Sequence, residues 1–312
     1  NITIDRKQII TSAEAMALPS LPKSMVIIGA GAIGVEFAYF YNAFGTKVTL
    51  VEMMPNILPI EDKELSRLLE SNFKKSGIEI LTEAKVESVT TGKEVKVTVA
   101  AKDGKKELKA DVTLMAVGVQ GNVENMGLET VGVKIEKGWI QVDDFGRTNV
   151  PGIYAIGDVA GPPWLAHVAS KEGIICVDAI AGKNPQPIDY ENIPGCTYCQ
   201  PQVASVGMTE ERAIAAGYQI KVGRFPFTAS GKARAIGETD GLVKLIFDAK
   251  YGELLGAHIL GSEATEMIAE LGVAKALETT ASGIFNTIHA HPTLSEAIME
   301  AAEQAYGHAI HI

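Results

Sequence analysis

Met25-Val-Ile-Ile-Gly29-Ala-Gly31-Ala-Ile-Gly34-Val-Glu36-Phe-Ala38 is the stretch that decides the fold of this 312-residue chain. A short apolar run predicts a buried strand that ends in three glycines, and the amphipathic stretch 33–44 predicts a helix. Gly29 permits a tight turn, Gly31 lets the backbone approach a pyrophosphate, and Gly34 allows close packing of helix on strand. The first amides of the helix, at its positive dipole end, would face the phosphates of a dinucleotide.

A second predicted strand, Lys47–Val51, leads into Glu52. A carboxylate at this position accepts hydrogen bonds from the adenine ribose hydroxyls and repels a 2′-phosphate. No arginine lies among residues 53–58. We therefore expect NAD to be preferred over NADP, the alternative being a solvent-exposed glutamate at a strand end.

The segments after Glu52 complete a nucleotide-binding domain that ends near Gly118. An amphipathic helix is predicted over Asp62–Ser76, with Gly77 as its stop. Alternating strands are predicted at Lys85–Thr90 and Val95–Val99, with a turn at residues 103–104. A buried strand over residues 111–118 closes this first domain.

A third signature is Thr148-Asn-Val-Pro-Gly-Ile-Tyr-Ala155-Ile-Gly157-Asp158. It predicts a strand that presents the Asp158 carboxylate at its C-terminal end, where a polyol or ribitol hydroxyl could bind. Asp158 could equally cap the next helix, which is predicted from about Leu165 to Ala181. A proline-rich stop over residues 182–187 follows.

The last part of the chain mixes strands and helices. Strands at Leu242–Phe247 and Glu253–Ile259 predict a hairpin. Ser262 is expected to cap a helix to about Leu277, and residues 295–306 predict another helix. The predicted organisation is an α/β fold with three parts: a doubly wound NAD domain (residues 1–118), a segment completing an FAD domain (119–189) and an α+β dimerisation domain (190–312).

His291-Pro-Thr-Leu-Ser-Glu296 places an imidazole and a carboxylate five residues apart. An imidazole titrates near neutral pH, and a nearby anion holds up its proton affinity. The pair therefore suits a general base. A structural histidine with a glutamate nearby is the alternative.

Cys196-Thr-Tyr-Cys199 could be a redox or metal-binding pair. The third cysteine, Cys176, is single, so a ribbon-type metal site lacks its second pair. Prolines and a glycine flank the motif where a thioredoxin-like pair would open a helix, which favours incidental thiols. Cys176 is expected to be buried in a helix.

Composition limits the classes of partner. The net charge is −10, which argues against nucleic acid and anionic membranes. No apolar run reaches the length of about 20 residues that spans a bilayer. Three cysteines provide no disulfide framework. We expect a cytoplasmic protein, or one from a mitochondrial or plastid matrix if a transit peptide was lost.

The three motifs, in this order and spacing, resemble those of the pyridine nucleotide–disulfide oxidoreductases, and within that family the branch that oxidises dihydrolipoamide. The resemblance covers nearly the whole chain. It implies electron transfer from a dithiol through a redox disulfide and FAD to NAD, with no metal. It also implies a homodimer that serves a lipoyl-bearing acyltransferase of a 2-oxoacid dehydrogenase complex, or the glycine cleavage system.

The resemblance implies a role for each matching residue. His291 and Glu296 would form the acid–base pair, with a cis His291–Pro292 bond, acting at the flavin of the other subunit. The remaining expected contacts are with the two cofactors: Gly29, Ala30, Gly31, Ala32, Ile33, Gly34, Val35, Glu36, Glu52, Val86 and Gly118 with NAD, and Asp158, Trp164, Leu165, Ala166 and His167 with FAD.

The sequence also departs from the family pattern. Gly118-Val-Gln-Gly-Asn122 replaces the usual Gly-Arg-x-Pro-Asn, so only Gly118 is expected to approach the cofactor. The family's first glycine-rich motif and its Cys-x4-Cys pair have no counterpart. We therefore expect a fragment without the N-terminal FAD and redox portion, inactive alone. Alternatives are an NAD-binding or dimerising module without catalysis, or another flavin disulfide reductase.

Overall fold

The computed structural model describes residues 2–312, which form two compact units. The first consists of the residues up to Val117 together with Pro194–Ile312, and the second is Gly118–Ile193. The first and third of the predicted domains (1–118, 119–189 and 190–312) pack into a single unit. The division into three domains stays a prediction.

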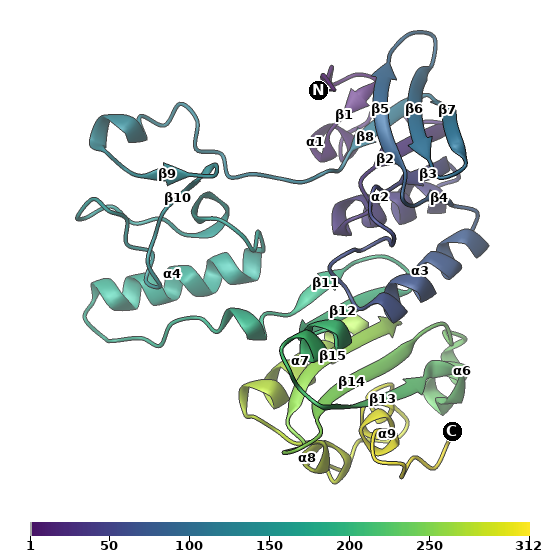
Figure 1. Cartoon of the computed structure of the whole chain (residues 1–312), viewed down its shortest axis with the longest axis vertical. Helices are drawn as coiled ribbons and strands as arrows, with labels where there is room; N and C mark the ends of the chain where they lie inside the picture. The colour runs from purple at the N-terminus through teal and green to yellow at the C-terminus, as the bar shows by residue number, and fades with distance from the viewer. Residues whose placement is uncertain (1) are drawn as a thin grey trace. The chain divides into compact units, whose positions relative to one another are not determined.

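The first unit contains a five-stranded parallel sheet in the order β1-β8-β2-β3-β4 (Figure 1). Its strands are β1 (Ile9–Ile10), β8 (Val112–Met115), β2 (Ser24–Ile28), β3 (Lys47–Val51) and β4 (Glu79–Leu81). The helices α1 (Ser12–Ala15), α2 (Ala32–Ala43) and α3 (Lys63–Lys75) belong to the same domain. Strand β8 crosses back to pair between β1 and β2, which gives the crossover order of a nucleotide-binding α/β fold.

Both faces of this sheet are covered. Met25 and Ile27 of β2 lie in one core with Leu65 and Leu69 of α3, whereas the alternate residue Val26 lies in a second core. That second core is closed by an antiparallel sheet of β5 (Lys85–Thr90), β6 (Val95–Ala101) and β7 (Gly104–Ala110). Because neighbouring side chains point to opposite faces of a strand, β2 is apolar at every position from 25 to 28.

A second five-stranded sheet, antiparallel, has the order β11-β12-β15-β14-β13. Its strands are β11 (Gly195–Thr197), β12 (Gln202–Gly207), β15 (Leu254–Gly261), β14 (Leu242–Asp248) and β13 (Ile220–Pro226). The predicted hairpin of β14 and β15 is confirmed. Together the two sheets confirm the predicted α/β domain and α+β domain.

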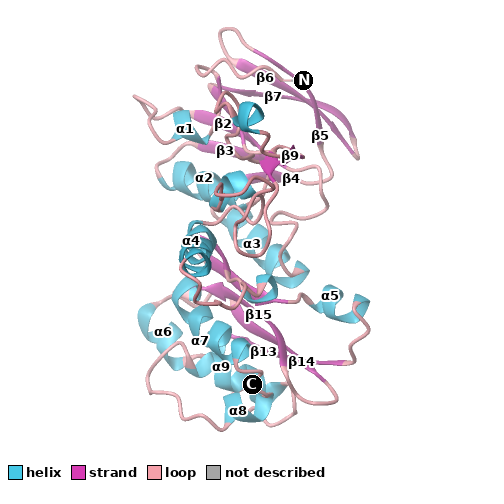
Figure 2. Ribbon diagram, turned by 90° about the vertical axis from the view of Figure 1, so that its left-hand side faces the viewer, coloured by secondary structure: helices cyan, strands magenta, loops and turns pink. Residues whose placement is uncertain are grey.

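Helices gather on one face of the antiparallel sheet (Figure 2). α7 (Ala264–Ala276), α8 (Ala281–Phe285) and α9 (Glu296–Gln304) share a core with Leu245 and Phe247 of β14. The intervening Ile246 packs instead with Ala213 of α5 (Glu210–Ala215). A shorter helix, α6 (Gly231–Ile236), completes this part.

One core joins the two sheets of the first unit. Leu65 and Leu69 of α3 lie in the same apolar cluster as Val203, Leu242 and Leu260 of the antiparallel sheet. Helix α3 therefore lies between the two sheets and packs on both, which explains why two segments far apart in sequence form one unit.

The start of α7 differs from the prediction. Its N-cap is Glu263, in a left-handed conformation with φ of 59°, and not Ser262. The side chain of Gln202 supplies the missing acceptor, because its Oε1 accepts hydrogen bonds from the Thr265 amide (3.1 Å) and hydroxyl (2.9 Å). A residue from another strand thus satisfies the helix end that a serine was expected to cap.

The second unit holds little regular structure. It contains the hairpin β9 (Ile135–Glu136) and β10 (Trp139–Ile140), the helix α4 (Ala166–Ile180) and short 3-10 turns, including one at Gly157–Ala160. The strand predicted over Ala155–Asp158 is wrong for the described residues, where a 3-10 turn begins at Gly157 and the segment before it makes one isolated bridge, Arg147 to Tyr154. A strand requires a neighbouring strand to pair its backbone groups.

Candidate functional site

The glycine turn after β2 has the geometry that its motif predicts. Gly29 has φ of 101°, and a Cβ at this position would overlap the backbone of Ala116. The Gly29 amide donates a hydrogen bond of 2.8 Å to the Val51 carbonyl. Only a glycine fits this turn, because an L-residue is strained at this φ and has no space for its side chain.

The other two glycines differ in their surroundings. A Cβ on Gly34 would overlap the carbonyl oxygen of Gly29, so this glycine allows α2 to approach the turn. Gly31, the N-cap of α2, faces open space, because a Cβ added there would have no atom within 4 Å. No side chain caps α2, so its first amides are available to an anion. The turn therefore offers the cradle that a pyrophosphate requires.

The flanking residues of the motif divide between core and turn. Ala30 and Val35 are fully buried, whereas Ala32 and Ile33 lie in the first turn of α2. Val86, predicted to contact NAD, packs partly against the core between β5 and the parallel sheet.

Glu52 follows β3 and is buried beside the glycine turn. Its Oε2 accepts a hydrogen bond of 2.7 Å from the Ala30 amide, and its Oε1 accepts one of 2.8 Å from the Met54 amide. Both oxygens keep further acceptor capacity. The structure thus brings Glu52 and the glycine motif together, as predicted, although they are 22 positions apart.

Glu36 makes a contact that the sequence does not indicate. Its Oε1 accepts a hydrogen bond of 2.8 Å from the Tyr198 amide, 162 positions away. Tyr198 lies between the two cysteines of the Cys-x-x-Cys motif. Cys196 and Cys199 are both free, and burial is the main factor that raises the pKa of Cys199 to about 12. Such a thiol is almost wholly protonated at neutral pH, which weakens the redox interpretation.

The residues predicted to bind FAD lie in the second unit. Asp158 is exposed in the 3-10 turn Gly157–Ala160, and its backbone carbonyl accepts a hydrogen bond of 3.2 Å from the Trp164 indole. Leu165 is the N-cap of α4, with no side-chain cap, and Ala166 and His167 open the helix. Asp158 therefore does not cap α4. Gly118, with φ of 142°, also belongs to this unit.

Cys176 lies in α4 and is buried, as predicted. Burial raises the pKa of its thiol. Within the described residues, no group of three or more His, Cys, Asp or Glu side chains is arranged to hold a metal ion. None of the helices over residues 2–312 has the length and apolar character needed to cross a bilayer.

His291 and Glu296 form the predicted hydrogen bond. The Nδ1 atom of His291 lies 2.9 Å from Oε1 of Glu296, and the His291–Pro292 bond is cis, as the resemblance implied. Since an ionised carboxylate only accepts hydrogen bonds, Nδ1 carries the hydrogen. In the neutral ring Nε2 is then the basic nitrogen. The His291 side chain is 78% exposed, and no partner for Nε2 is found within residues 2–312.

Glu296 is held from two sides at the first turn of α9. Its second oxygen accepts a hydrogen bond of 2.8 Å from the Thr293 amide. Burial acts to raise the pKa of Glu296, but the hydrogen bonds from Thr293 and His291 outweigh it and the pKa is lowered. Glu296 therefore stays an anion that orients the ring. Sequence reasoning missed Thr293, although a threonine three residues before a helical glutamate resembles a capping box.

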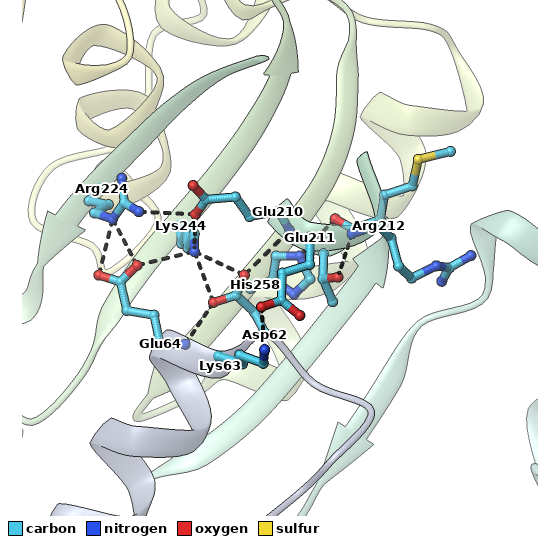
Figure 3. Close-up of polar contacts among 11 residues, drawn as sticks. Asp62, Lys63, Glu64, Glu210, Glu211, Arg212, Arg224, Lys244 and His258 are labelled. Carbon is cyan, nitrogen blue, oxygen red and sulfur yellow. Dashed lines mark hydrogen bonds and ion pairs between the residues drawn. The ribbon is translucent and has the colours of Figure 1, made fainter. Parts of the chain in front are cut away.

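Five charged side chains and one histidine form a cluster on the β14 face toward α3 and α5, in which Lys244, Asp62 and His258 are buried and the other three are partly exposed (Figure 3). Lys244 is at its centre and contacts Asp62 (2.9 Å), Glu64 (3.1 Å) and Glu210 (2.7 Å). Arg224 pairs with Glu64 and Glu210 in turn. The sixth member, His258, lies beside Asp62, and its Nε2 is 2.9 Å from the Met208 carbonyl.

The chain matches two family models. Residues 2–173 match that of the pyridine nucleotide-disulphide oxidoreductases, and residues 193–302 match the dimerisation domain of the same family.

Named relatives cover nearly the whole chain. A dihydrolipoyl dehydrogenase of Rhizobium etli is 53% identical over 97% of this chain and 64% of its own length. A dihydrolipoyl dehydrogenase of Zymomonas mobilis is 52% identical over 100% of this chain and 67% of its own length. The chain thus spans about two thirds of these relatives.

Two solved structures also have a similar fold. The Cu(II) complex of the HOCl-induced flavoprotein disulfide reductase RclA from Escherichia coli superposes with a TM-score of 0.90 at 29% identity, covering 97% of this chain and 68% of that chain. LpdA from Mycobacterium tuberculosis gives a TM-score of 0.87 at 30% identity, with coverages of 96% and 65%.

Proposed function

Because this chain belongs to the pyridine nucleotide-disulphide oxidoreductase family, we propose that it supplies the acid–base pair and the NAD site for the dihydrolipoyl dehydrogenase reaction. In this reaction dihydrolipoamide and NAD⁺ give lipoamide, NADH and a proton. The observation that carries the proposal is the exposed Nε2 of His291, whose ring is held through Nδ1 by Glu296. The dihydrolipoyl dehydrogenases that match this chain at about 50% identity support the choice of substrate.

His291 supplies the base. A substrate thiol gives its proton to Nε2 as its sulfur becomes a thiolate, and the imidazole becomes a cation. Glu296 then stabilises that cation through the bond to Nδ1 and keeps its own negative charge, since its pKa is lowered. In the reverse direction the same nitrogen returns the proton.

The dinucleotide site is suited to NAD. The open space at Gly31 and the uncapped start of α2 would hold the pyrophosphate, and Glu52 would accept hydrogen bonds from the ribose hydroxyls. Asp158 and the uncapped start of α4 would contact FAD. FAD held there would supply the relay for an electron pair from the dithiol side to NAD.

A homodimer is the proposed assembly, with His291 acting at the flavin of the other subunit. The match of residues 193–302 to a dimerisation domain supports it. The lipoyl group would be carried by an acyltransferase of a 2-oxoacid dehydrogenase complex or by the glycine cleavage system. The cytoplasmic location stays a prediction.

The 312-residue chain alone is expected to show no dithiol-to-NAD turnover. Its three cysteines are free thiols, and those of Cys176 and Cys199 are buried. None of them suits a redox disulfide that exchanges with substrate. Turnover by this chain alone, at the rate of the dihydrolipoyl dehydrogenases that it matches, would contradict this part of the proposal.

A variant of His291 tests the base. In an FAD-loaded enzyme that contains this chain together with a redox disulfide, His291→Gln should lower the rate of dihydrolipoamide oxidation by about 10²–10⁴-fold, the usual contribution of a general base. Transfer of electrons from NADH to an artificial acceptor should persist, because that reaction removes no proton from a thiol and so needs no base at His291. Equal loss of both activities would show that His291 does not act as the base.

A further inference from the structure

His289 and Glu270 form a second histidine–glutamate pair, and His289 lies two residues before His291. The His289 side chain is only 6% exposed. Its Nε2 is 2.8 Å from Oε1 of Glu270 on α7, and its Nδ1 is 2.9 Å from the carbonyl oxygen of Thr287. The proposed mechanism uses neither His289 nor Glu270.

Both partners of His289 are acceptors. A backbone carbonyl and an ionised carboxylate have no hydrogen to donate, so each bond requires a hydrogen on the imidazole nitrogen. Because the acceptor on Glu270 is a carboxylate, its bond to Nε2 is charge-assisted, which makes it stronger than a neutral one.

The position of His289 matters because of what surrounds it. Residues 286–295 connect α8 to α9 without helix or strand. Ile288 in this connection is 96% exposed, so the stretch beside His289 has no apolar anchor, whereas Leu294 near the other end is buried in the core. The His289 ring joins the connection to α7 through Glu270, and it also fixes the turn through Thr287. His291 projects from the same connection two residues later.

We propose that His289 is a positioning residue, whose two hydrogen bonds tie the connection 286–295 to α7 and thereby hold His291 at its distance from Glu296. This role rests on the proposed function, since it serves the base of that reaction. Glu270 is its anchor. His289 itself touches neither the substrate nor a cofactor in this role.

Three substitutions on α7 separate anchoring from general stability. Glu270→Ala removes the acceptor for Nε2. Glu270→Gln keeps a carbonyl acceptor at the same place and removes the charge. Glu266→Ala removes an exposed carboxylate one turn earlier on the same face of the helix and is the matched control. Because Glu270 is itself exposed, all three variants should fold, which thermal unfolding checks.

The first measurement uses the 312-residue chain and needs no activity. Side-chain ¹⁵N spectra of the histidines report which nitrogen of His291 carries the hydrogen. In the wild type and in Glu266→Ala we expect the Nδ1–H form of the neutral ring. In Glu270→Ala this form should lose population to the Nε2–H form, and Glu270→Gln should restore most of it. An unchanged His291 spectrum in Glu270→Ala would overturn the proposal.

The second measurement uses an FAD-loaded enzyme that contains this chain together with a redox disulfide. Glu270→Ala should lower kcat for dihydrolipoamide by about 10- to 100-fold with little change in KM, because a misplaced base slows the chemical step. His289→Gln should behave in the same way. A wild-type enzyme without dithiol oxidation would refute the proposed function, whereas full activity in both variants would refute the positioning role alone.

Discussion

Both carboxylate oxygens of Asp62 accept a hydrogen bond of 2.9 Å from the Lys244 ammonium, although the two residues lie 182 positions apart. Asp62 is the N-cap of α3 in the nucleotide-binding part, and Lys244 is in the middle of β14 in the antiparallel sheet. The side chains are 4% and 3% exposed. This ion pair therefore joins the two parts of the first unit in a place from which water is excluded.

Loss of the central cation should destabilise the fold. We expect Lys244→Met to lower the free energy of unfolding by about 3–5 kcal/mol, because it leaves the buried carboxylate of Asp62 without its partner. Urea unfolding measures this. The matched control is Lys96→Met on β6, which breaks the ion pair with Glu107 between half-exposed side chains and should cost about 0–1 kcal/mol. Equal effects of the two substitutions would contradict this interpretation of the cluster.

The contribution of Asp62 should depend on pH. Burial is the largest effect and acts to raise its pKa, but the hydrogen bond and charge of Lys244, together with His258 and the Glu64 amide, outweigh it, and the pKa lies below its ordinary value of 3.8. A carboxylate with a lowered folded pKa stabilises the fold above its unfolded pKa, and this contribution is lost as the pH falls through the folded value. Asp62→Asn should therefore destabilise most at pH 7, and its difference from wild type should shrink below about pH 4.

The control for Asp62→Asn is Asp240→Asn, at a position outside the cluster. Unfolding free energies at several pH values decide the question. A gap between Asp62→Asn and wild type that stays constant from pH 7 to pH 3 would show that the charge of Asp62 has no part in it.

Alanine substitutions at Gly34 and Gly31 should have different effects, the first on stability and the second on NADH binding. Gly34→Ala places a methyl group on the Gly29 carbonyl oxygen and should cost about 1–3 kcal/mol of stability through overpacking. Gly31→Ala meets no neighbouring atom, so stability should hold. Its methyl group would instead occupy the approach to the pyrophosphate and weaken NADH binding about tenfold or more, which is about 1.4 kcal/mol or more.

Thermal unfolding and calorimetric titration with NADH separate these two outcomes. Normal NADH affinity in Gly31→Ala would place the pyrophosphate elsewhere.

The chain should bind NADH in preference to NADPH. Glu52 repels a 2′-phosphate and has acceptor capacity for the ribose hydroxyls. Glu52→Ala should narrow the difference between the affinities for NADH and NADPH. Glu52→Gln should narrow it too, while it still fills the space of the side chain and keeps one oxygen that can accept from the Ala30 or Met54 amide. Glu87→Gln, at an exposed ion pair on β5, is the control. Equal affinity of the wild-type chain for the two cofactors by calorimetry would refute the preference.

Much of the fold and the site follows from local sequence. The order apolar run, Gly29, Gly31, Gly34 indicates a strand, a turn and a helix, because Gly29 adopts the positive φ of the turn and Gly34 lets the helix approach Gly29 five residues earlier. His291 and Glu296 are also local, since the start of α9 brings residues five apart within hydrogen-bond distance. The boundaries of α3 and α4 agree with the prediction within a residue for the same reason.

Other features were decided only by the tertiary structure. Gln202, rather than Ser262, satisfies the start of α7, and Tyr198 donates to Glu36 across 162 positions. Lys244 resembles an ordinary strand lysine until α3 and α5 place three carboxylates around it. Local sequence sets backbone conformation through sterics and short-range hydrogen bonds. The partner of a buried charge or an unsatisfied amide depends on which distant segments pack together, and no local pattern of residues encodes that choice.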